Sequence, residues 1–418
     1  SQSARTMLSF LFNNWQYRQS LSGDVGLFGH SRGGEAVLTL AREIDSMDLP
    51  YFVRTVLSLA PTDSAEGGGF NESLDGDESR SFLAIYGTAD EDVTNPCIVG
   101  NQPWCGGTSI APKGNAFSLY DRAGSETSTE PLVLSSAIVT KAMLFVEGAD
   151  HNSFRNTCGG LPLFGVLSCS AHHDLLRGYT NAWMRWWLRD QEIYRGFFDG
   201  SYALPSISSV TIHQQFQEGF RRRVIDNCEN NSFSSNTIGG NVTAGFGSTT
   251  VVKEGTGYDY EGTIPHDTGM MIVRYSSGGF VPFLRWFISD TSNFFSGRHR
   301  DVRGYGYLSF RAGQVYGASQ NTPGLNANFF VELFDTSGSI SNALQVSQFA
   351  TLAYPSTTNG SNQGVNLTTV ASAMETVRIP LSCFRNVDKE NIASIRFRFS
   401  VPGQSDGELM LDNLEFTD

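Results

Sequence analysis

The strongest constraint on the fold comes from residues 25–47, where a strand pattern, a tight turn and a helix pattern follow one another directly. Residues 25–28 are a short apolar run, Gly29-His30-Ser31-Arg32-Gly33 fits GxSxG, and residues 33–47 have apolar side chains at helical spacing. Small residues beside a strained serine let the backbone turn sharply against a helix without a Cβ clash. A chain with 44 glycines can match GxSxG by chance. The prediction that Ser31 is a nucleophile therefore rests on the strand pattern before the motif and the helix pattern after it. The alternative is a glycine-rich turn that only begins a structural helix.

Strand-length apolar runs alternate with helix patterns through the first half of the chain. The runs cover residues 25–28, 52–60, 82–86 and 142–146. Helical spacing occupies residues 4–19, 33–47, 174–189 and 193–198, and Trp183, Trp186 and Trp187 are expected to form a core stripe. The alternation predicts an α/β fold, a doubly wound and mostly parallel sheet with helices on both faces.

After about residue 204 the pattern changes to short alternating segments separated by Gly, Ser and Asn. These segments are residues 270–275, 307–311, 329–334, 376–379, 395–399 and 409–414. We therefore predict an α/β domain over residues 1–204 and an all-β sandwich over residues 205–418. Within the second half, residues 356–364 are predicted to be an exposed loop, and the three arginines at 221–223 a solvated linker.

Charge and hydropathy exclude several classes of partner. The net charge of -13 argues against nucleic acid, because phosphate binding needs a cationic face. No apolar run approaches the roughly 18 to 20 residues that span a bilayer, so no membrane span is predicted. The sequence has neither an initiator methionine nor a signal-peptide pattern, and we expect Ser1 to mark a processed or trimmed start.

The six cysteines form an even set that suggests a secreted, extracellular protein. Proximity along the chain favours three pairs over the other connectivities, with buried free thiols as the alternative. The favoured pairs are Cys97 with Cys105, Cys158 with Cys169, and Cys228 with Cys383.

A serine nucleophile needs a base to take its proton and an acid to hold that base in the correct tautomer. Run 82–86 leads into GTADEDV, which contains Asp90, and run 142–146 leads into EGADHN, which contains His151. Because the carboxyl ends of parallel strands meet at one edge of a sheet, both loops are expected to lie beside Ser31. We therefore predict the catalytic set Ser31, Asp90 and His151.

Other residues remain candidates for these roles. Asp92 is the alternative acid, although it lies further along its loop. His172 and His173 are reserve bases, but they open the tryptophan-rich helix, where a capping or packing role is plainer. Asp150 adjoins His151 and is expected to point elsewhere.

The oxyanion of an acyl-transfer intermediate needs two backbone donors, and the first is the N–H of the residue after the nucleophile, here Arg32. The second donor comes from a loop after an early strand, well upstream of the serine turn, yet only about 28 residues precede Gly29. Without earlier strands, run 25–28 would be an unpaired apolar edge. We expect a separate, cleaved or omitted N-terminal segment to complete the fold.

The segment GHSRGGEA, followed by GTADEDV and GADHN, resembles the α/β-hydrolase superfamily over about residues 1–200. Its neighbourhood is similar to cutinase-like, dienelactone-hydrolase-like and chlorophyllase-like esterases, which place serine, acid and histidine in this order. The resemblance implies hydrolysis of carboxylic esters without a metal or organic cofactor, with Ser31, Asp90 and His151 in the triad roles. This chain departs from the family in its short N-terminal part.

The second half resembles jelly-roll modules of carbohydrate-binding type, through VIDNCE, TIGG and MLDNLEF. The resemblance implies a polysaccharide or other polymer surface as partner, and it would allow a structural calcium ion, although no compact acidic cluster in the sequence identifies a site. Tyr258, Tyr260 and Trp286 could stack on sugar rings, but core packing is the default expectation.

These inferences give two hypotheses of different classes. The first is a secreted serine hydrolase that cleaves lipid, polyester or polysaccharide esters through an acyl-enzyme. The second is a non-catalytic surface or glycan-binding protein with a vestigial hydrolase domain. Labelling of Ser31 by a fluorophosphonate would separate them.

Overall fold

The computed structural model describes residues 2–14, 16, 23–45, 51–63, 74, 80–90, 93, 115–124, 139–155, 167–202, 204, 209–219, 222–245, 249–256, 264–266, 268–276, 281–289, 299–362, 365–370, 372–399 and 401–418. The described residues up to Gln217 form one compact unit together with residues 358–369, and the remaining ones form a second unit. Strands dominate the described secondary structure, with few helices. Within the described residues, no helix is long and apolar enough to cross a membrane.

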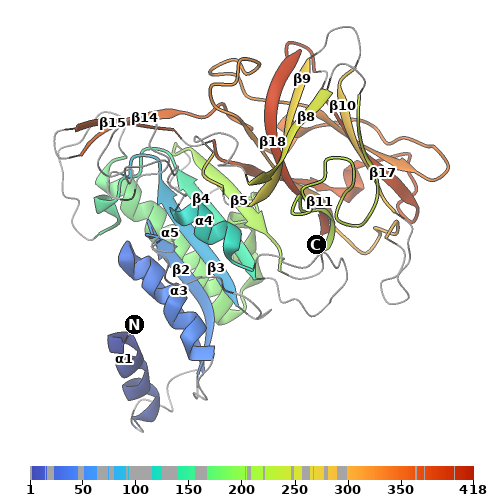
Figure 1. Cartoon of the computed structure of the whole chain (residues 1–418). Coiled ribbons are helices and arrows are strands. Elements are labelled where there is room, and N and C mark those ends of the chain that lie inside the picture. Colours follow the sequence, from blue (N-terminus) through green and yellow to red (C-terminus); the bar gives the residue numbers. More distant parts are fainter. Residues whose placement is uncertain are drawn as a thin grey trace. The chain divides into compact units, whose positions relative to one another are not determined.

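The first unit is built on a five-stranded sheet in the order β1-β2-β3-β4-β5 (Figure 1). Its strands are β1 (Asp24–His30), β2 (Phe52–Leu59), β3 (Ser81–Gly87), β4 (Thr140–Val146) and β5 (Ile212–Gln217). Its helices are α1 (Gln2–Asn13), α3 (Arg32–Asp45), α4 (Asn115–Arg122) and α5 (Cys169–Arg189), with 3-10 turns η2 (Asn152–Phe154) and η3 (Glu192–Phe197). The first four strands pair in parallel, whereas β5 pairs antiparallel with β4. β5 therefore extends this sheet beyond the predicted domain boundary at residue 204.

Helices cover both faces of this sheet. Thr55 on β2 accepts a 2.6 Å hydrogen bond from the Trp183 indole of α5, while Ser58 on the same strand donates to the Gly34 carbonyl of α3 at 2.8 Å. Successive strand residues point to opposite faces, so positions three apart place α5 and α3 on opposite sides. The three tryptophans of α5 are buried, and the expectation that they form a core stripe is confirmed.

The second unit is a β-sandwich in a jelly-roll arrangement, as predicted (Figure 1). One sheet has the order β13-β12-β17-β10-β7, and the other has β16-β11-β18-β9-β8 with β6 paired to β18. The last strand, β18, is thus central in one sheet and the penultimate strand, β17, is central in the other. The strands are β6 (Arg223–Asp226), β7 (Val242–Ala244), β8 (Thr249–Thr256), β9 (Gly269–Ser276), β10 (Phe283–Phe287), β11 (Tyr307–Gln314), β12 (Phe330–Asp335), β13 (Leu344–Gln345), β16 (Glu375–Pro380), β17 (Ile392–Arg398) and β18 (Asp406–Thr417), with 3-10 turns η5 (Val346–Gln348) and η6 (Leu381–Cys383).

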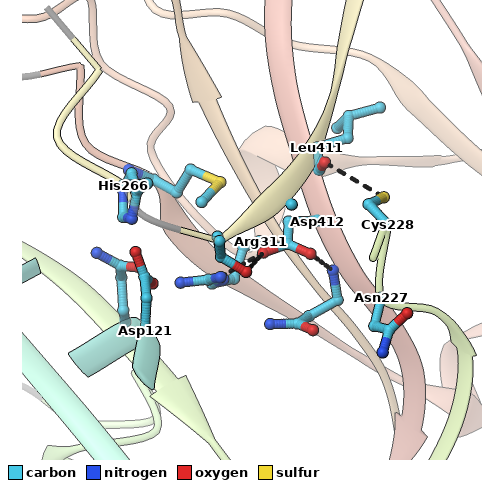
Figure 2. A network of polar contacts seen from close by, with 12 residues as sticks. Asp121, Asn227, Cys228, His266, Arg311, Leu411 and Asp412 are labelled. Carbon is cyan, nitrogen blue, oxygen red and sulfur yellow. Dashed lines mark hydrogen bonds and ion pairs between the residues drawn. The ribbon is translucent and has the colours of Figure 1, made fainter. Parts of the chain in front are cut away.

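Aromatic side chains fill the space between the two sheets. The ring centroids of Phe310 and Phe397 are 4.6 Å apart, and those of Trp286 and Phe397 are 4.8 Å apart. Trp286 is 2% exposed and donates its indole N–H to Asp226 Oδ2 at 2.8 Å, so it belongs to the core and is not a sugar-stacking residue. Tyr258 and Tyr260 lie outside the described residues. A buried ion pair between Arg311 of β11 and Asp412 of β18 links neighbouring strands (Figure 2).

Two predictions for the second half are wrong. The predicted loop at residues 356–364 contains β14 (Thr357–Asn362), which pairs with β15 (Val365–Val370) as a two-stranded sheet. A polar stretch can form such a ribbon because main-chain groups supply the ladder hydrogen bonds. The predicted solvated arginine linker is wrong for the two of its residues that the structure describes, and Arg221 lies outside them. Arg222 forms a buried 3.2 Å ion pair with Glu415, and Arg223 starts β6 with its guanidinium donating to the His299 carbonyl.

The predicted pairing of Cys228 with Cys383 is also wrong, because both are free thiols. Cys228 Sγ lies 3.8 Å from the carbonyl oxygen of Leu411 on β18 (Figure 2). Cys383 instead lies three residues after Pro380, near the last residue of β18. Pro380 pairs with Tyr307, and Tyr307 also pairs with Thr417 of β18. Leu411 and Thr417 are separated by roughly 20 Å of strand, far more than a disulfide spans.

The other predicted cysteine pairs are only partly visible. Cys169 is in a disulfide. Its predicted partner, Cys158, lies outside the described residues, and so do Cys97 and Cys105.

Candidate functional site

Ser31 occupies the turn between β1 and α3, in the backbone conformation that a strained nucleophile turn requires. Its φ is +59°, in the left-handed region that non-glycine residues seldom adopt. The Ser31 amide donates to the Leu59 carbonyl at 2.9 Å, and its own carbonyl accepts from the Gly34 amide at 2.8 Å. These bonds fix the backbone on both sides of the serine.

Gly29 is required at this turn for steric reasons. A Cβ atom at Gly29 would lie 2.0 Å from the carbonyl oxygen of Gly33, and that atom is backbone and cannot move aside. At Gly33 itself an added Cβ would meet nothing within 4 Å. The first glycine of the motif is thus the one that the geometry demands.

Three side chains from three loops form a continuous hydrogen-bonded chain. Ser31 Oγ lies 3.0 Å from His151 Nε2, and His151 Nδ1 lies 2.9 Å from Asp90 Oδ2. Asp90 also accepts from the Val93 amide at 2.7 Å through Oδ1. His151 and Asp90 are 2% and 3% exposed, so the imidazole and the carboxylate are shielded from water. The structure therefore brings together the three residues that the sequence singled out.

The loop that carries Asp90 and the loop that carries His151 are joined by hydrogen bonds. The Thr88 amide donates to the Val146 carbonyl at 3.0 Å, the Ala89 amide donates to the Ala149 carbonyl at 3.0 Å, and the Gly148 amide donates to Thr88 Oγ1 at 2.9 Å. A Cβ atom at Gly87 would come within 2.0 Å of the Ala149 carbonyl oxygen. This close approach holds Asp90 and His151 at a fixed separation.

His172, one of the reserve bases, supports the His151 loop from α5. Its Nδ1 donates to the Ser168 carbonyl at 3.2 Å, which leaves Nε2 to accept from the Asp150 amide at 3.1 Å. Burial lowers the pKa of His172, which favours the neutral ring that this bond requires. Asp150 itself accepts from Ser153 through both carboxylate oxygens, so it points away from the His151 ring, as expected.

Two further residues near the site escaped the sequence-based prediction. His30 donates from Nε2 to the His151 carbonyl at 3.0 Å, and its ring lies 4.6 Å from that of His151. Burial, and then the charge of Asp90, raise the pKa of Tyr86 well above its usual range. His30 lies inside the GxSxG segment, and its position next to Ser31 in the sequence could have identified it as a residue near the site.

The remaining predicted residues are placed as follows. Arg32 is the first residue of α3, where backbone amides have no acceptor within the helix, as an oxyanion donor needs. His173 lies on α5 with Nε2 2.9 Å from the Arg155 carbonyl, away from the serine. Asp92 lies outside the described residues. No group of three or more His, Cys, Asp or Glu in the described parts could hold a metal ion.

A second candidate site is the outer face of the sheet formed by β12, β17 and β10. Leu284 and Trp286 of β10 point into the core, so Phe283, Arg285 and Phe287 point outward. The strand registers place nine outward residues in three rows, which we call the arginine–phenylalanine face: Phe330, Arg398 and Phe283; Glu332, Arg396 and Arg285; Phe334, Ser394 and Phe287.

Guanidinium groups lie on aromatic rings across this face. Arg285 lies 4.1 Å from the Phe334 ring centroid and 4.6 Å from that of Phe287, and Arg398 lies 4.2 Å from that of Phe330. The three arginines and the outward rings of β10 are partly exposed. This arrangement fixes planar cations on a rigid sheet.

Comparisons with known proteins give only distant structural similarities. No protein-family model matches the chain, and neither does any curated protein. Among solved structures, a family 11 carbohydrate-binding module of a cellulosomal cellulase of Clostridium thermocellum is 16% identical, with a TM-score of 0.27, covering 47% of this chain and 94% of that one. An exo-beta-agarase is 10% identical, with a TM-score of 0.30 and coverages of 46% and 25%. A module specific for non-crystalline cellulose is 13% identical, with a TM-score of 0.23 and coverages of 36% and 76%.

Proposed function

We propose that the chain is a serine hydrolase that cleaves carboxylic esters at Ser31. The observation that carries this proposal is the hydrogen-bonded chain from Ser31 Oγ through His151 to Asp90, set on a left-handed turn between a strand and a helix. Nucleophile, base and orienting acid are each within hydrogen-bond reach of the next, which is the geometric requirement for this chemistry. Ester substrates are proposed from the sequence resemblance to α/β-hydrolase esterases.

We propose the following role for each residue. His151 Nε2 takes the proton of Ser31 Oγ as that oxygen attacks the ester carbonyl, while Asp90 holds the Nδ1 proton and stabilises the imidazolium that forms. The Arg32 amide at the start of α3 donates to the developing oxyanion, aided by the positive end of the helix dipole. His151 then protonates the leaving alcohol, and water deprotonated by the same ring releases the acyl group.

The test is the reaction of Ser31 with a fluorophosphonate and with p-nitrophenyl esters. The parent chain should be labelled and should hydrolyse the esters, whereas Ser31→Ala should do neither while unfolding at the same temperature. Ser201→Ala, which changes an exposed serine, should behave like the parent. Ester turnover retained by Ser31→Ala would refute the assignment. A folded parent chain that resists labelling would favour the vestigial-hydrolase alternative.

We further propose that the β-sandwich binds polysaccharide in an extracellular setting. The arginine–phenylalanine face supports this role, since it presents partly exposed rings and hydrogen-bond donors on a rigid surface. The disulfide at Cys169 supports an oxidising compartment. Retention of the Ser31→Ala chain on insoluble polysaccharides tests the binding role, and passage through all of them without delay would contradict it.

A further inference from the structure

The arginine–phenylalanine face is positively charged on a strongly acidic protein. Its nine residues include three arginines and one glutamate, whereas the whole chain carries -13. Glu332 pairs with Arg396 at 2.7 Å and with Arg398 at 3.5 Å. The face thus keeps a surplus of positive charge after its own ion pairs are counted.

Arg285 carries part of that surplus. Its register partner is Arg396, and like charges directly opposite each other destabilise a sheet. Its Nε donates to Ser394 Oγ at 2.8 Å, and no carboxylate in the described residues forms an ion pair with it. Burial, and then the charge of Arg396, lower the pKa of Arg285. An anion bound here would relieve this repulsion.

The Arg285 guanidinium is already held in place for such an anion. It lies against Phe334 and Phe287, and the bond to Ser394 fixes its plane. A planar guanidinium binds a carboxylate through two parallel hydrogen bonds, and a side chain ordered beforehand loses less entropy on binding. The arrangement therefore favours a carboxylate over a hydroxyl group as its ligand.

We propose that the arginine–phenylalanine face binds an acidic polysaccharide built of uronic acid units, with Arg285 as the residue that holds a carboxylate. This inference rests on the proposed polysaccharide binding and specifies its ligand. Arg396 and Arg398 stand two residues apart on β17, about 7 Å, so a linear polymer with a carboxylate on each unit meets several cations. The partly exposed rings of Phe283 and Phe330 offer apolar surface to the sugar C–H groups between them.

The experiment uses the full chain with Ser31→Ala, so that no ester is cleaved during binding. Isothermal titration calorimetry compares polygalacturonate, the same polymer fully methyl-esterified, a neutral β-glucan and poly-L-glutamate. We expect binding to polygalacturonate that weakens as NaCl rises, at least tenfold weaker binding to the esterified polymer, and weaker binding again to polyglutamate.

Variants locate the site. Arg285→Gln should weaken polygalacturonate binding at least tenfold, and Arg285→Lys, which keeps the charge but loses the planar fork, should fall between that variant and the parent. Arg274→Gln is the matched control, because Arg274 is an exposed arginine paired with Glu408 on the other sheet. Circular dichroism verifies that each variant is folded.

The outcomes separate the two proposals. Equal binding of the acidic and esterified polymers would overturn the charge inference while supporting polysaccharide binding. Absence of binding to every polysaccharide would overturn both. Polyglutamate binding as tight as that of polygalacturonate, or unchanged affinity in both folded Arg285 variants, would overturn the inference.

Discussion

The β-sandwich should lose stability as the pH rises from 5 to 8, because two buried carboxyl groups favour their protonated forms. Burial raises the pKa of Asp226 to about 6 and that of Glu254 to about 7. Glu254 Oε1 accepts from the Ser232 amide, while its buried Oε2 has no hydrogen-bond partner. A carboxylate with these surroundings is costly to ionise.

The sign follows from proton linkage. In the unfolded chain both groups titrate near pH 4, so between pH 4 and 7 the folded sandwich binds more protons. The contribution to stability is complete below about pH 4 and is lost as the pH rises through about 6 to 7. Asp226 accounts for about 1.5 kcal/mol between pH 5 and 8. Glu254, discounted for solvent screening, adds about 1 kcal/mol.

Urea unfolding at pH 5 and pH 8 measures this loss, with a chelator present to exclude metal binding. Trp286, the single tryptophan of residues 218–418, reports on the sandwich by its fluorescence. Glu254→Gln keeps the acceptor for Ser232, so it should match the parent at pH 5 and exceed it by about 1 kcal/mol at pH 8. Glu375→Gln on β16 is the control. A parent chain that grows more stable from pH 5 to 8, or a Glu254→Gln variant with the same pH slope, would refute the reasoning.

Three further predictions concern the proposed catalytic site. Asp90→Asn should lower kcat about 10³ to 10⁴-fold in ester assays without changing the unfolding temperature, because the amide favours the wrong histidine tautomer; a loss below tenfold would exclude Asp90 as the orienting acid. Gly29→Ala should destabilise the first unit by about 3 kcal/mol, since its Cβ meets the Gly33 carbonyl, and thermal unfolding at parental temperature would contradict this. His172→Phe should lower kcat about tenfold at constant KM by leaving the Asp150 amide unpaired; a parental kcat would show that His172 does not position His151.

The sequence predicts best where local geometry is strict. The serine turn needs a glycine at residue 29, a strand before it and a helix after it, and all three signals stand next to one another in the chain. The loops carrying Asp90 and His151 were identifiable because each follows an apolar run that is fully buried as β3 or β4. Their catalytic roles remain predictions that the proposed variants test.

Prediction fails where the deciding contact is distant in the chain. β5 is polar, and nothing local shows that it pairs with β4. Arg222 is part of a basic cluster in the sequence, but its partner Glu415 is almost two hundred residues away. α4 was missed because its eight residues are too few for a clear helical period. The free thiols of Cys228 and Cys383 depend on strand register, which spacing along the chain does not contain.

Ser31 follows an edge strand of the described sheet, whereas Asp90 and His151 follow interior strands. β1, which leads into Ser31, has β2 as its strand partner and forms the edge of the described sheet. β3 and β4 are interior strands, and three hydrogen bonds join their loops, two between main-chain groups and one to the Thr88 hydroxyl. Local opening starts where the fewest hydrogen bonds must break. Amide hydrogens of β1 should therefore exchange with solvent before those of β3, and the nucleophile can leave its base while the histidine–aspartate pair stays assembled. A segment or ligand that covers the outer edge of β1 in the described sheet should therefore slow this exchange.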